Sequence, residues 1–224
     1  MRAIQNWDNT SMRSKWTIAG ILLLLIVGGW WLASGEPTYD WPVTNAPPSG
    51  SRIIAFGDSL TDGKGADRQR AYPAQLAERL GVPILNAGVS GNTTDDAMQR
   101  LKADVLAQNP DIVIICLGGN DFMRRRNIDT TFKNLREMID KIQSQGAMVV
   151  LVGLTFPMGS AYGPRYEELA RETGSAFVAD ILDGILGRDS LMSDAIHPNE
   201  TGYGKMVDRI EPILRKHLSM ETAQ

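Results

Sequence analysis

The sequence predicts an α/β domain in which a central parallel β-sheet carries helices on both faces. Short apolar stretches alternate with longer amphipathic ones from residue 52 to residue 218, and this alternation is typical of strand–helix–strand units. The unbroken apolar run Ile112–Cys116 indicates a strand that is covered on both sides. A chain of 224 residues is long enough for one such domain with its own core.

The predicted elements follow from local patterns along residues 52–218, and residues 219–224 are expected to be a tail. Thr93 and Asp96 have the spacing of a capping box, which starts a helix, and Gly146 is expected to end another. The apolar runs place strands at 52–56, 82–86, 111–117, 148–154 and 176–178. The helical periodicities place helices at 72–80, 94–108, 130–145, 164–173 and 200–218.

The N-terminal segment is expected to export the domain. Residues 16–35 carry no charge, and this stretch is just long enough to form a membrane-spanning helix. Residues 1–15 would then be a short cytoplasmic N-terminus. Arg13 and Lys15 precede the stretch and Glu36 and Asp40 follow it, which predicts an extracytoplasmic, periplasmic domain. The alternative is a signal peptide cleaved near Gly35. We favour an uncleaved anchor because the segment before the apolar core is long. The proline-rich stretch 36–51 is expected to be a semi-extended tether outside the core.

Composition excludes several function classes. The net charge of −3 gives no general reason to expect a nucleic-acid partner. The single cysteine, Cys116, allows no internal disulfide, and its apolar surroundings favour a small buried residue over a nucleophile. Two histidines and one cysteine do not show the spacing of a His/Cys metal site, so no metal and no other cofactor is expected.

Three polar or glycine-rich segments follow the first three predicted strands, where parallel sheets gather their active sites. The first contains Ser59, whose hydroxyl is a poor nucleophile unless a base takes its proton. His197 is the histidine placed for this role, because His217 is expected to be solvated on the last turns of a helix. Asp194, three residues before His197, could orient its imidazole. Read singly, Asp194 could be a helix or turn cap and His197 a surface turn residue; read with Ser59, they predict a serine hydrolase.

Four blocks in order resemble the SGNH, or GDSL-type, hydrolase family over residues 52–215. They are Gly57-Asp58-Ser59-Leu60, Asn86-Ala87-Gly88, Gly119-Asn120-Asp121 and Asp194-x-x-His197-Pro198. The resemblance implies a three-layer, flavodoxin-like sandwich and ester hydrolysis by Ser59, His197 and Asp194. It also implies an oxyanion hole formed by the backbone N–H groups of Ser59 and Gly88 and by the side-chain amide of Asn120.

Within that family the chain is most similar to the thioesterase I, lysophospholipase and arylesterase branch, through residues 86–93, 118–122 and 157–166. Ala161 stands where this branch often has asparagine, and Ala195 where it often has glycine. The resemblance implies substrate contacts at Asp58, Asn92, Tyr162 and Ile196, although Asp58 is expected to fix its loop rather than to do chemistry. Arg124–Arg126 is expected to be a solvated segment, with an anionic head group as the alternative partner.

The expected activity is hydrolysis of a small acyl ester, thioester or lysolipid through an acyl-enzyme on Ser59. One alternative is an exported carbohydrate O-deacetylase of the same family. The other comes from a different class: a membrane-tethered binding protein that has kept the hydrolase fold without its activity.

Overall fold

A computed structural model of the chain describes residues 39–156 and 161–219, and within them it forms the expected α/β sandwich. Five strands form one parallel sheet in the order β2-β1-β3-β4-β5, which is a flavodoxin-like arrangement. The strands are β1 (Ile53–Gly57), β2 (Ile84–Gly88), β3 (Ile112–Cys116), β4 (Met148–Val152) and β5 (Ala176–Val178). Every residue of β1, β3 and β4 is buried, as expected for strands covered on both faces.

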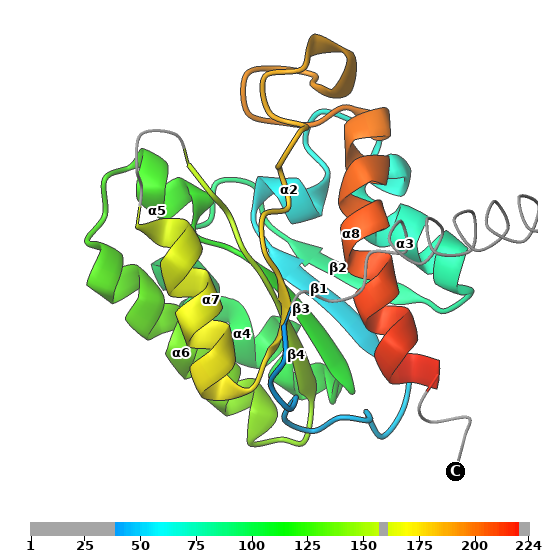
Figure 1. The fold of residues 1–224 in the computed structure, drawn as a ribbon, viewed down its shortest axis with the longest axis vertical. Helices are drawn as coiled ribbons and strands as arrows, with labels where there is room; N and C mark the ends of the chain where they lie inside the picture. Colours follow the sequence, from blue (N-terminus) through cyan, green and yellow to red (C-terminus); the bar gives the residue numbers. More distant parts are fainter. Residues whose placement is uncertain (1–38, 157–160, 220–224) are drawn as a thin grey trace, which may run out of the picture. The chain divides into compact units, whose positions relative to one another are not determined.

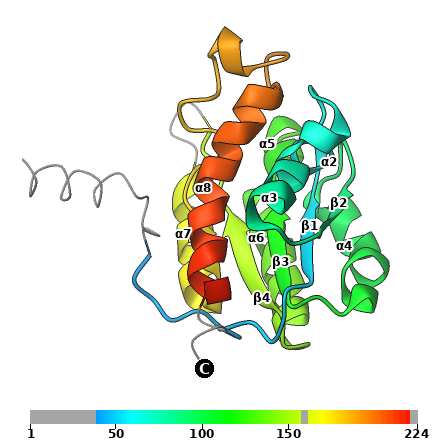
Figure 2. The same ribbon diagram turned by 90° about the vertical axis from the view of Figure 1, so that its right-hand side faces the viewer.

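The helices form two layers, one on each side of the sheet (Figures 1 and 2). Helices α3 and α8 pack against each other on one side, and α4 packs on α6, which packs on α7, on the other. The α-helices are α2 (Ser59–Asp62), α3 (Tyr72–Leu80), α4 (Thr94–Asp104), α5 (Gly119–Met123), α6 (Ile128–Gln143), α7 (Tyr162–Thr173) and α8 (Glu200–Ser219). The 3₁₀ turns are η1 (Arg68–Arg70), η2 (Leu106–Gln108) and η3 (Asp189–Leu191).

Local signals explain most of the element boundaries. The expected capping box is present, because Thr93 accepts from the Asp96 N–H and Asp96 accepts from the Thr93 N–H. Strand β2 starts two residues later than expected, after Pro83, which has no N–H to pair. The helix expected at 94–108 ends at Asp104. Asn109 has a positive φ of 49° before Pro110, a position where helical backbone is disfavoured.

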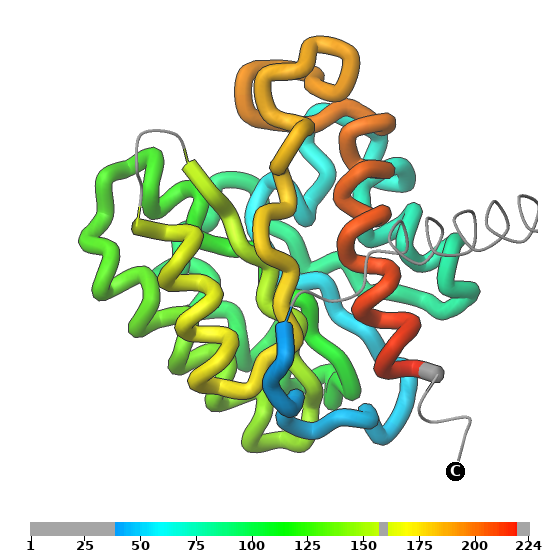
Figure 3. Tube along the Cα trace, in the orientation of Figure 1, coloured from blue at the N-terminus to red at the C-terminus, as the bar shows by residue number. Residues whose placement is uncertain are grey.

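The expectation of a tether before the first strand is wrong for residues 39–51, which pack on the domain. Tyr39 is 7% exposed and belongs to the core. The Trp41 indole N–H donates to the Ser175 carbonyl at 2.9 Å, and the Thr44 N–H donates to the Gly174 carbonyl at 2.8 Å. Figure 3 shows this blue segment running beneath the sheet toward the red end of α8. Aromatic side chains among the prolines supply the apolar area that a tether would lack.

The expectation that His217 is solvated is also wrong. It lies 4% exposed on the last turns of α8, and its Nε2 is 2.9 Å from the Tyr39 hydroxyl. The segment before β1 therefore contacts α8, the last helix of the domain, through Tyr39.

The expected membrane-spanning stretch at 16–35 lies outside the described residues. Within residues 39–156 and 161–219, no helix is both long enough and apolar enough to cross a bilayer.

Candidate active site

Ser59 is the first residue of α2, directly after β1, and two neighbours fix it there. The Asp58 carboxylate accepts from the Leu60 N–H at 3.1 Å and so caps α2. Gly57 lets α2 approach the sheet, because a Cβ there would lie 2.0 Å from Thr61 Oγ1. Ser59 itself is 8% exposed. Its hydroxyl is therefore held on a rigid strand-to-helix corner rather than on a free loop.

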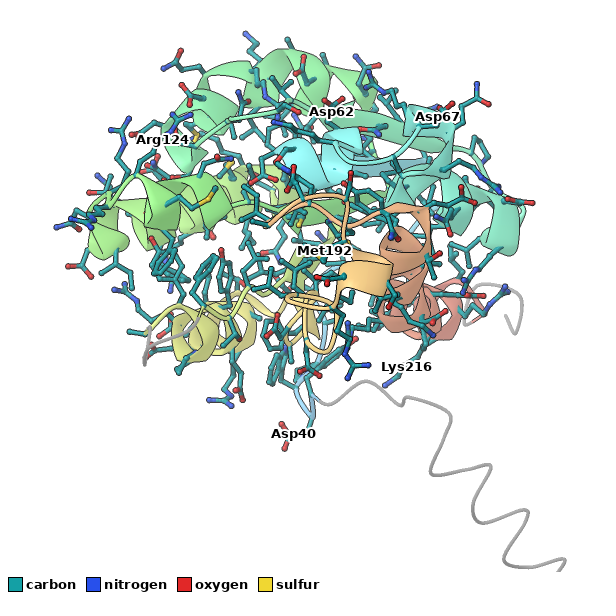
Figure 4. The ribbon with its side chains drawn as sticks, turned by 90° about the horizontal axis from the view of Figure 1, so that it is seen from above. Asp40, Asp62, Asp67, Arg124, Met192 and Lys216 are labelled. Atoms are coloured by element: carbon teal, nitrogen blue, oxygen red, sulfur yellow. The ribbon has the colours of Figure 1, made fainter. Side chains whose placement is uncertain are left out.

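The structure brings His197 and Asp194 to Ser59. His197 Nε2 lies 3.1 Å from Ser59 Oγ across 138 residues of sequence, and His197 Nδ1 lies 2.7 Å from Asp194 Oδ2. A tight turn presents the imidazole, since Met192 and Pro198 form a β-bridge and the Ser193 N–H donates to the His197 carbonyl at 2.9 Å. Figure 4 looks down on this end of the sheet, with Met192 near the centre. A serine hydroxyl, an imidazole and a carboxylate thus lie in the hydrogen-bonding order of a Ser-His-Asp triad.

Asp194 is held as a carboxylate by its hydrogen bonds although its side chain is 49% exposed. The Ile196 and His197 N–H groups donate to its Oδ1, each at 2.9 Å. The backbone hydrogen bond from Ile196, and then that from the His197 ring, lower the pKa of Asp194 to about 2. Asp194 is therefore ionised at any ordinary assay pH, and as a carboxylate it can accept a hydrogen bond from an Nδ1–H of His197.

Two of the three candidate oxyanion donors, Asn120 and Gly88, already have acceptors within the protein. Asn120 is 8% exposed, and its Nδ2 donates to Asp58 Oδ2 at 3.2 Å and to the Asn92 carbonyl at 3.0 Å. The Gly88 N–H donates to Asn86 Oδ1 at 2.9 Å. Gly88 lies against α2, because a Cβ on it would be 2.1 Å from the Asp62 nitrogen. A developing oxyanion would have to share these N–H groups with their present acceptors.

Asp58 is an internal residue. It is 3% exposed, and its two oxygens accept from the Leu60 N–H and from Asn120. Burial raises its pKa to about 7. These contacts agree with the expected loop-fixing role.

The other three predicted substrate contacts have different surroundings. Ile196 is 42% exposed beside His197, so its side chain is accessible. Asn92 turns its side-chain oxygen to Arg100 at 2.6 Å. Tyr162 is 4% exposed and packs edge-on against the stacked rings of Phe122 and Phe156. Part of the predicted loop, residues 157–160, lies outside the described residues.

The arginine triplet directly follows α5, and Figure 4 shows Arg124 toward the outside of the molecule. Arg124 donates to the Gly91 carbonyl at 2.9 Å, and Arg126 lies 3.5 Å from Asp95. All three arginines are exposed. The expectation of a solvated segment agrees with these exposures, although two of the three side chains also have a protein partner.

Sequence reasoning gave no role to Asn86 or Arg100. Asn86 joins β2 to α2, because its Nδ2 donates to the Thr61 carbonyl at 2.8 Å while its Oδ1 accepts from Gly88. The contact of an asparagine side chain with the N–H two residues later is a local pattern that sequence reasoning could have found. Arg100 stands on an amphipathic helix, and nothing in its local sequence separates it from a solvated arginine.

Comparison with known proteins shows which protein family this chain resembles. A sequence model described as "GDSL-like Lipase/Acylhydrolase family" matches residues 55–205. Esterase TesA of Pseudomonas aeruginosa is 31% identical over 177 residues, which cover 73% of this chain and 87% of that protein. Thioesterase 1/protease 1/lysophospholipase L1 of Escherichia coli is 28% identical, over 70% of this chain and 79% of that protein. The crystal structure of a Geobacillus acetyl-xylooligosaccharide esterase mutant has a TM-score of 0.62 and 25% identity, over 75% of this chain and 96% of that one.

Proposed function

Because the chain belongs to the GDSL-like lipase/acylhydrolase family and is an ester-bond hydrolase, we propose that Ser59, His197 and Asp194 are its catalytic residues. The observation that carries the proposal is the 3.1 Å separation of His197 Nε2 from Ser59 Oγ. Two histidines occur in the chain, and the other one is buried against Tyr39. His197 is thus the base that this site offers.

In the proposed reaction, Ser59 Oγ forms a bond to the acyl carbon while His197 Nε2 takes the hydroxyl proton. The carbon–oxygen or carbon–sulfur bond of the ester then breaks, and His197 gives that proton to the leaving alcohol or thiol. A water molecule then forms a bond to the acyl carbon while His197 Nε2 takes its proton. The bond between the acyl carbon and Ser59 Oγ breaks, and His197 returns that proton to Ser59 as the acid product leaves. Asp194 holds the Nδ1–H tautomer and stabilises the imidazolium.

The proposed oxyanion donors are the N–H groups of Ser59 and Gly88 and the Asn120 amide. They act without a metal or another cofactor, because preorganised neutral donors stabilise the charge that develops on the carbonyl oxygen. Glycine suits the middle position, since a side chain there would meet α2.

The proposed substrates are small acyl or aryl esters, thioesters and lysolipids. Support comes from the branch-like segments around Asn92 and Asn120 and from relatives that are named as an esterase and as a thioesterase/lysophospholipase. The accessible Ile196 side chain beside His197 gives an apolar contact for an acyl or aryl group.

The test is hydrolysis of p-nitrophenyl acetate and butyrate by the purified protein and by Ser59→Ala. We expect the variant to lose the activity and to lose labelling by a fluorophosphonate probe. Ser144→Ala, which changes an exposed serine after α6, is the matched control and should keep both. Equal activity in wild type and Ser59→Ala would remove Ser59 from the mechanism. A lack of labelling in active wild type would do the same.

A second candidate is an exported carbohydrate O-deacetylase. The similarity to an acetyl-xylooligosaccharide esterase favours it. A panel of acetylated oligosaccharide, lysophospholipid and acyl thioesters of several chain lengths separates the two, since each hypothesis expects the higher kcat/KM for its own substrate class.

The proposed location is the extracytoplasmic side of the cytoplasmic membrane, with residues 16–35 as the anchor. The support is the uncharged stretch and the cationic residues Arg13 and Lys15 before it. The mass of the mature protein tests this proposal, because loss of about 35 N-terminal residues would replace the anchor with a cleaved signal peptide.

A further inference from the structure

Arg100 of α4 reaches from its helix to the carboxyl ends of two strands. Its side chain is 15% exposed, and the guanidinium carbon lies 4.3 Å from the centre of the Phe56 ring. Nη2 donates to the Gly57 carbonyl at 2.8 Å, and Nη1 donates to the Ala87 carbonyl at 2.8 Å. Nε donates to Asn92 Oδ1 at 2.6 Å. Nη1 also donates to Asp104 one helical turn away, at 2.9 Å. A planar fork with several fixed donors suits such an array, which a lysine could not reproduce.

Apart from Asp104, these acceptors lie beside the proposed oxyanion donors: two are in segments that carry a donor, and the third, Asn92, accepts a hydrogen bond from one. Gly57 ends β1 two residues before Ser59. The Ala87 carbonyl and the Gly88 N–H belong to the same peptide group. Asn92 accepts the Asn120 amide on its main-chain carbonyl at 3.0 Å while its side chain accepts from Arg100.

The contact on Ala87 has an electronic consequence as well as a geometric one. A cationic donor on a carbonyl oxygen polarises the whole peptide group, and linked hydrogen bonds strengthen one another. The N–H of that same peptide, on Gly88, therefore becomes a stronger donor. Because Gly88 already donates to Asn86 at 2.9 Å, added donor strength helps it to serve a second acceptor.

We propose that Arg100 is a positioning residue for the oxyanion hole, which fixes the three donor segments relative to one another and polarises the Gly88 N–H. This inference rests on the proposed function, since it assigns Arg100 a task in stabilising the oxyanion. Arg100 acts through other groups, and no contact with substrate is assigned to it. Its effect should therefore fall on the chemical step rather than on substrate binding.

The test compares Arg100→Ala and Arg100→Lys with wild type and with Arg136→Ala. Arg136 is a partly exposed arginine of α6 whose guanidinium pairs with Glu172 of α7. We expect kcat to fall by about 10–100-fold in both Arg100 variants, with KM changed by less than about threefold. The rate of fluorophosphonate labelling should fall in parallel, because the phosphoryl oxygen uses the same donors. Methylguanidine should raise kcat of Arg100→Ala and leave Arg136→Ala unchanged.

Two failures are distinguishable. If wild type shows no Ser59-dependent hydrolysis, the proposed function fails, and the inference fails with it. If wild type is active while folded Arg100→Ala keeps its kcat, or loses activity only through KM, the inference alone is refuted. Circular dichroism and thermal unfolding report whether the variants fold. If neither Arg100 variant folds, Arg100 is a structural residue and the inference is also refuted.

Discussion

Tyr39 provides a direct test of whether the segment before β1 belongs to the folded domain. Two substitutions separate its contributions. Tyr39→Phe keeps the ring and removes the hydroxyl that lies 2.9 Å from His217 Nε2. Tyr39→Ala removes the ring as well. Asp40→Ala, at the exposed neighbouring position, is the matched control.

The structure sets the expected magnitudes. Tyr39 is 7% exposed, and replacing a buried aromatic residue by alanine typically destabilises by about 3–5 kcal/mol. Tyr39→Phe leaves His217 Nε2 buried without its partner, which costs about 1–3 kcal/mol. The other ring nitrogen of His217, Nδ1, has no hydrogen-bond partner among the described residues. A rotated imidazole would therefore find no second acceptor or donor there to replace the lost contact with the Tyr39 hydroxyl. The Asp40 control should change stability by less than about 0.5 kcal/mol.

Urea unfolding followed by circular dichroism measures these differences, and its pH dependence adds a second readout. Burial lowers the pKa of His217. The unfolded chain therefore binds a proton at a higher pH than the folded one, and stability contributed by His217 is lost as pH falls below about 6.5. In Tyr39→Ala, water reaches the imidazole, and this loss should become smaller. A Tyr39→Ala protein within about 0.5 kcal/mol of wild type would show that the segment is not part of the fold.

Three further substitutions test the site. Gly65 has a φ of +101°, and a Cβ on it would lie 2.5 Å from the Pro198 carbonyl and 3.1 Å from His197 Cβ. Gly65→Ala should lower kcat by about 100-fold because the new side chain displaces His197. Gly146→Ala is the control, since Gly146 also has a positive φ but has open space around it, and its kcat should not change. Equal kcat values in the two variants would contradict this expectation. Asp58→Asn tests the raised pKa of Asp58. The carboxyl of Asp58 keeps its proton up to about pH 7 in the folded state but releases it near pH 3.9 in the unfolded state. The free energy of unfolding of wild type should therefore fall relative to that of the variant, by up to about 4 kcal/mol, as pH rises between these two values. A difference in urea unfolding that does not change with pH would refute the raised pKa. Asp194→Asn should lower kcat by about 10²–10⁴-fold at every pH above about 4, because the wild-type carboxylate is ionised throughout that range. A variant kcat within tenfold of the wild-type value would exclude the orienting role of Asp194.

Patterns that depend on neighbours in sequence were predictable. The apolar run at Ile112–Cys116 and the helix at Tyr72–Leu80 needed only local composition and periodicity. The rule that active-site residues gather where parallel strands end predicted the place of Ser59. The meeting of Ser59 with His197 was predicted from the Asp194-x-x-His197-Pro198 block and the family resemblance. The sheet does bring these two segments, 138 residues apart, to one end.

Features that depend on a distant partner were not predictable. Nothing near Tyr39 indicates that a histidine 178 residues away will bury it, so the prolines around it favoured a tether. His217 was predicted to be solvated because the last turns of a terminal helix are usually exposed, and its sequence neighbours do not reveal the contact with Tyr39. Arg100 is the clearest case, because its sequence shows only an i,i+4 pair with Asp104, whereas its acceptors near the site are main-chain carbonyls and an amide, which leave no pattern of charges.

The segment that holds Tyr39 also determines where the domain can be attached to something else. Residues 44–51 contact Gly174, Ala147 and Asp111, which all precede strands, whereas Ser59 and His197 lie where strands end. The contact of Tyr39 with His217 brings the C-terminal helix to the same end. A bead, a reporter protein or a surface linked through either end of the described domain would therefore face the amino ends of the strands. Ser59, the proposed nucleophile, would lie at the end of the sheet that faces away from the support, so an immobilised form of this enzyme should stay open to dissolved substrates.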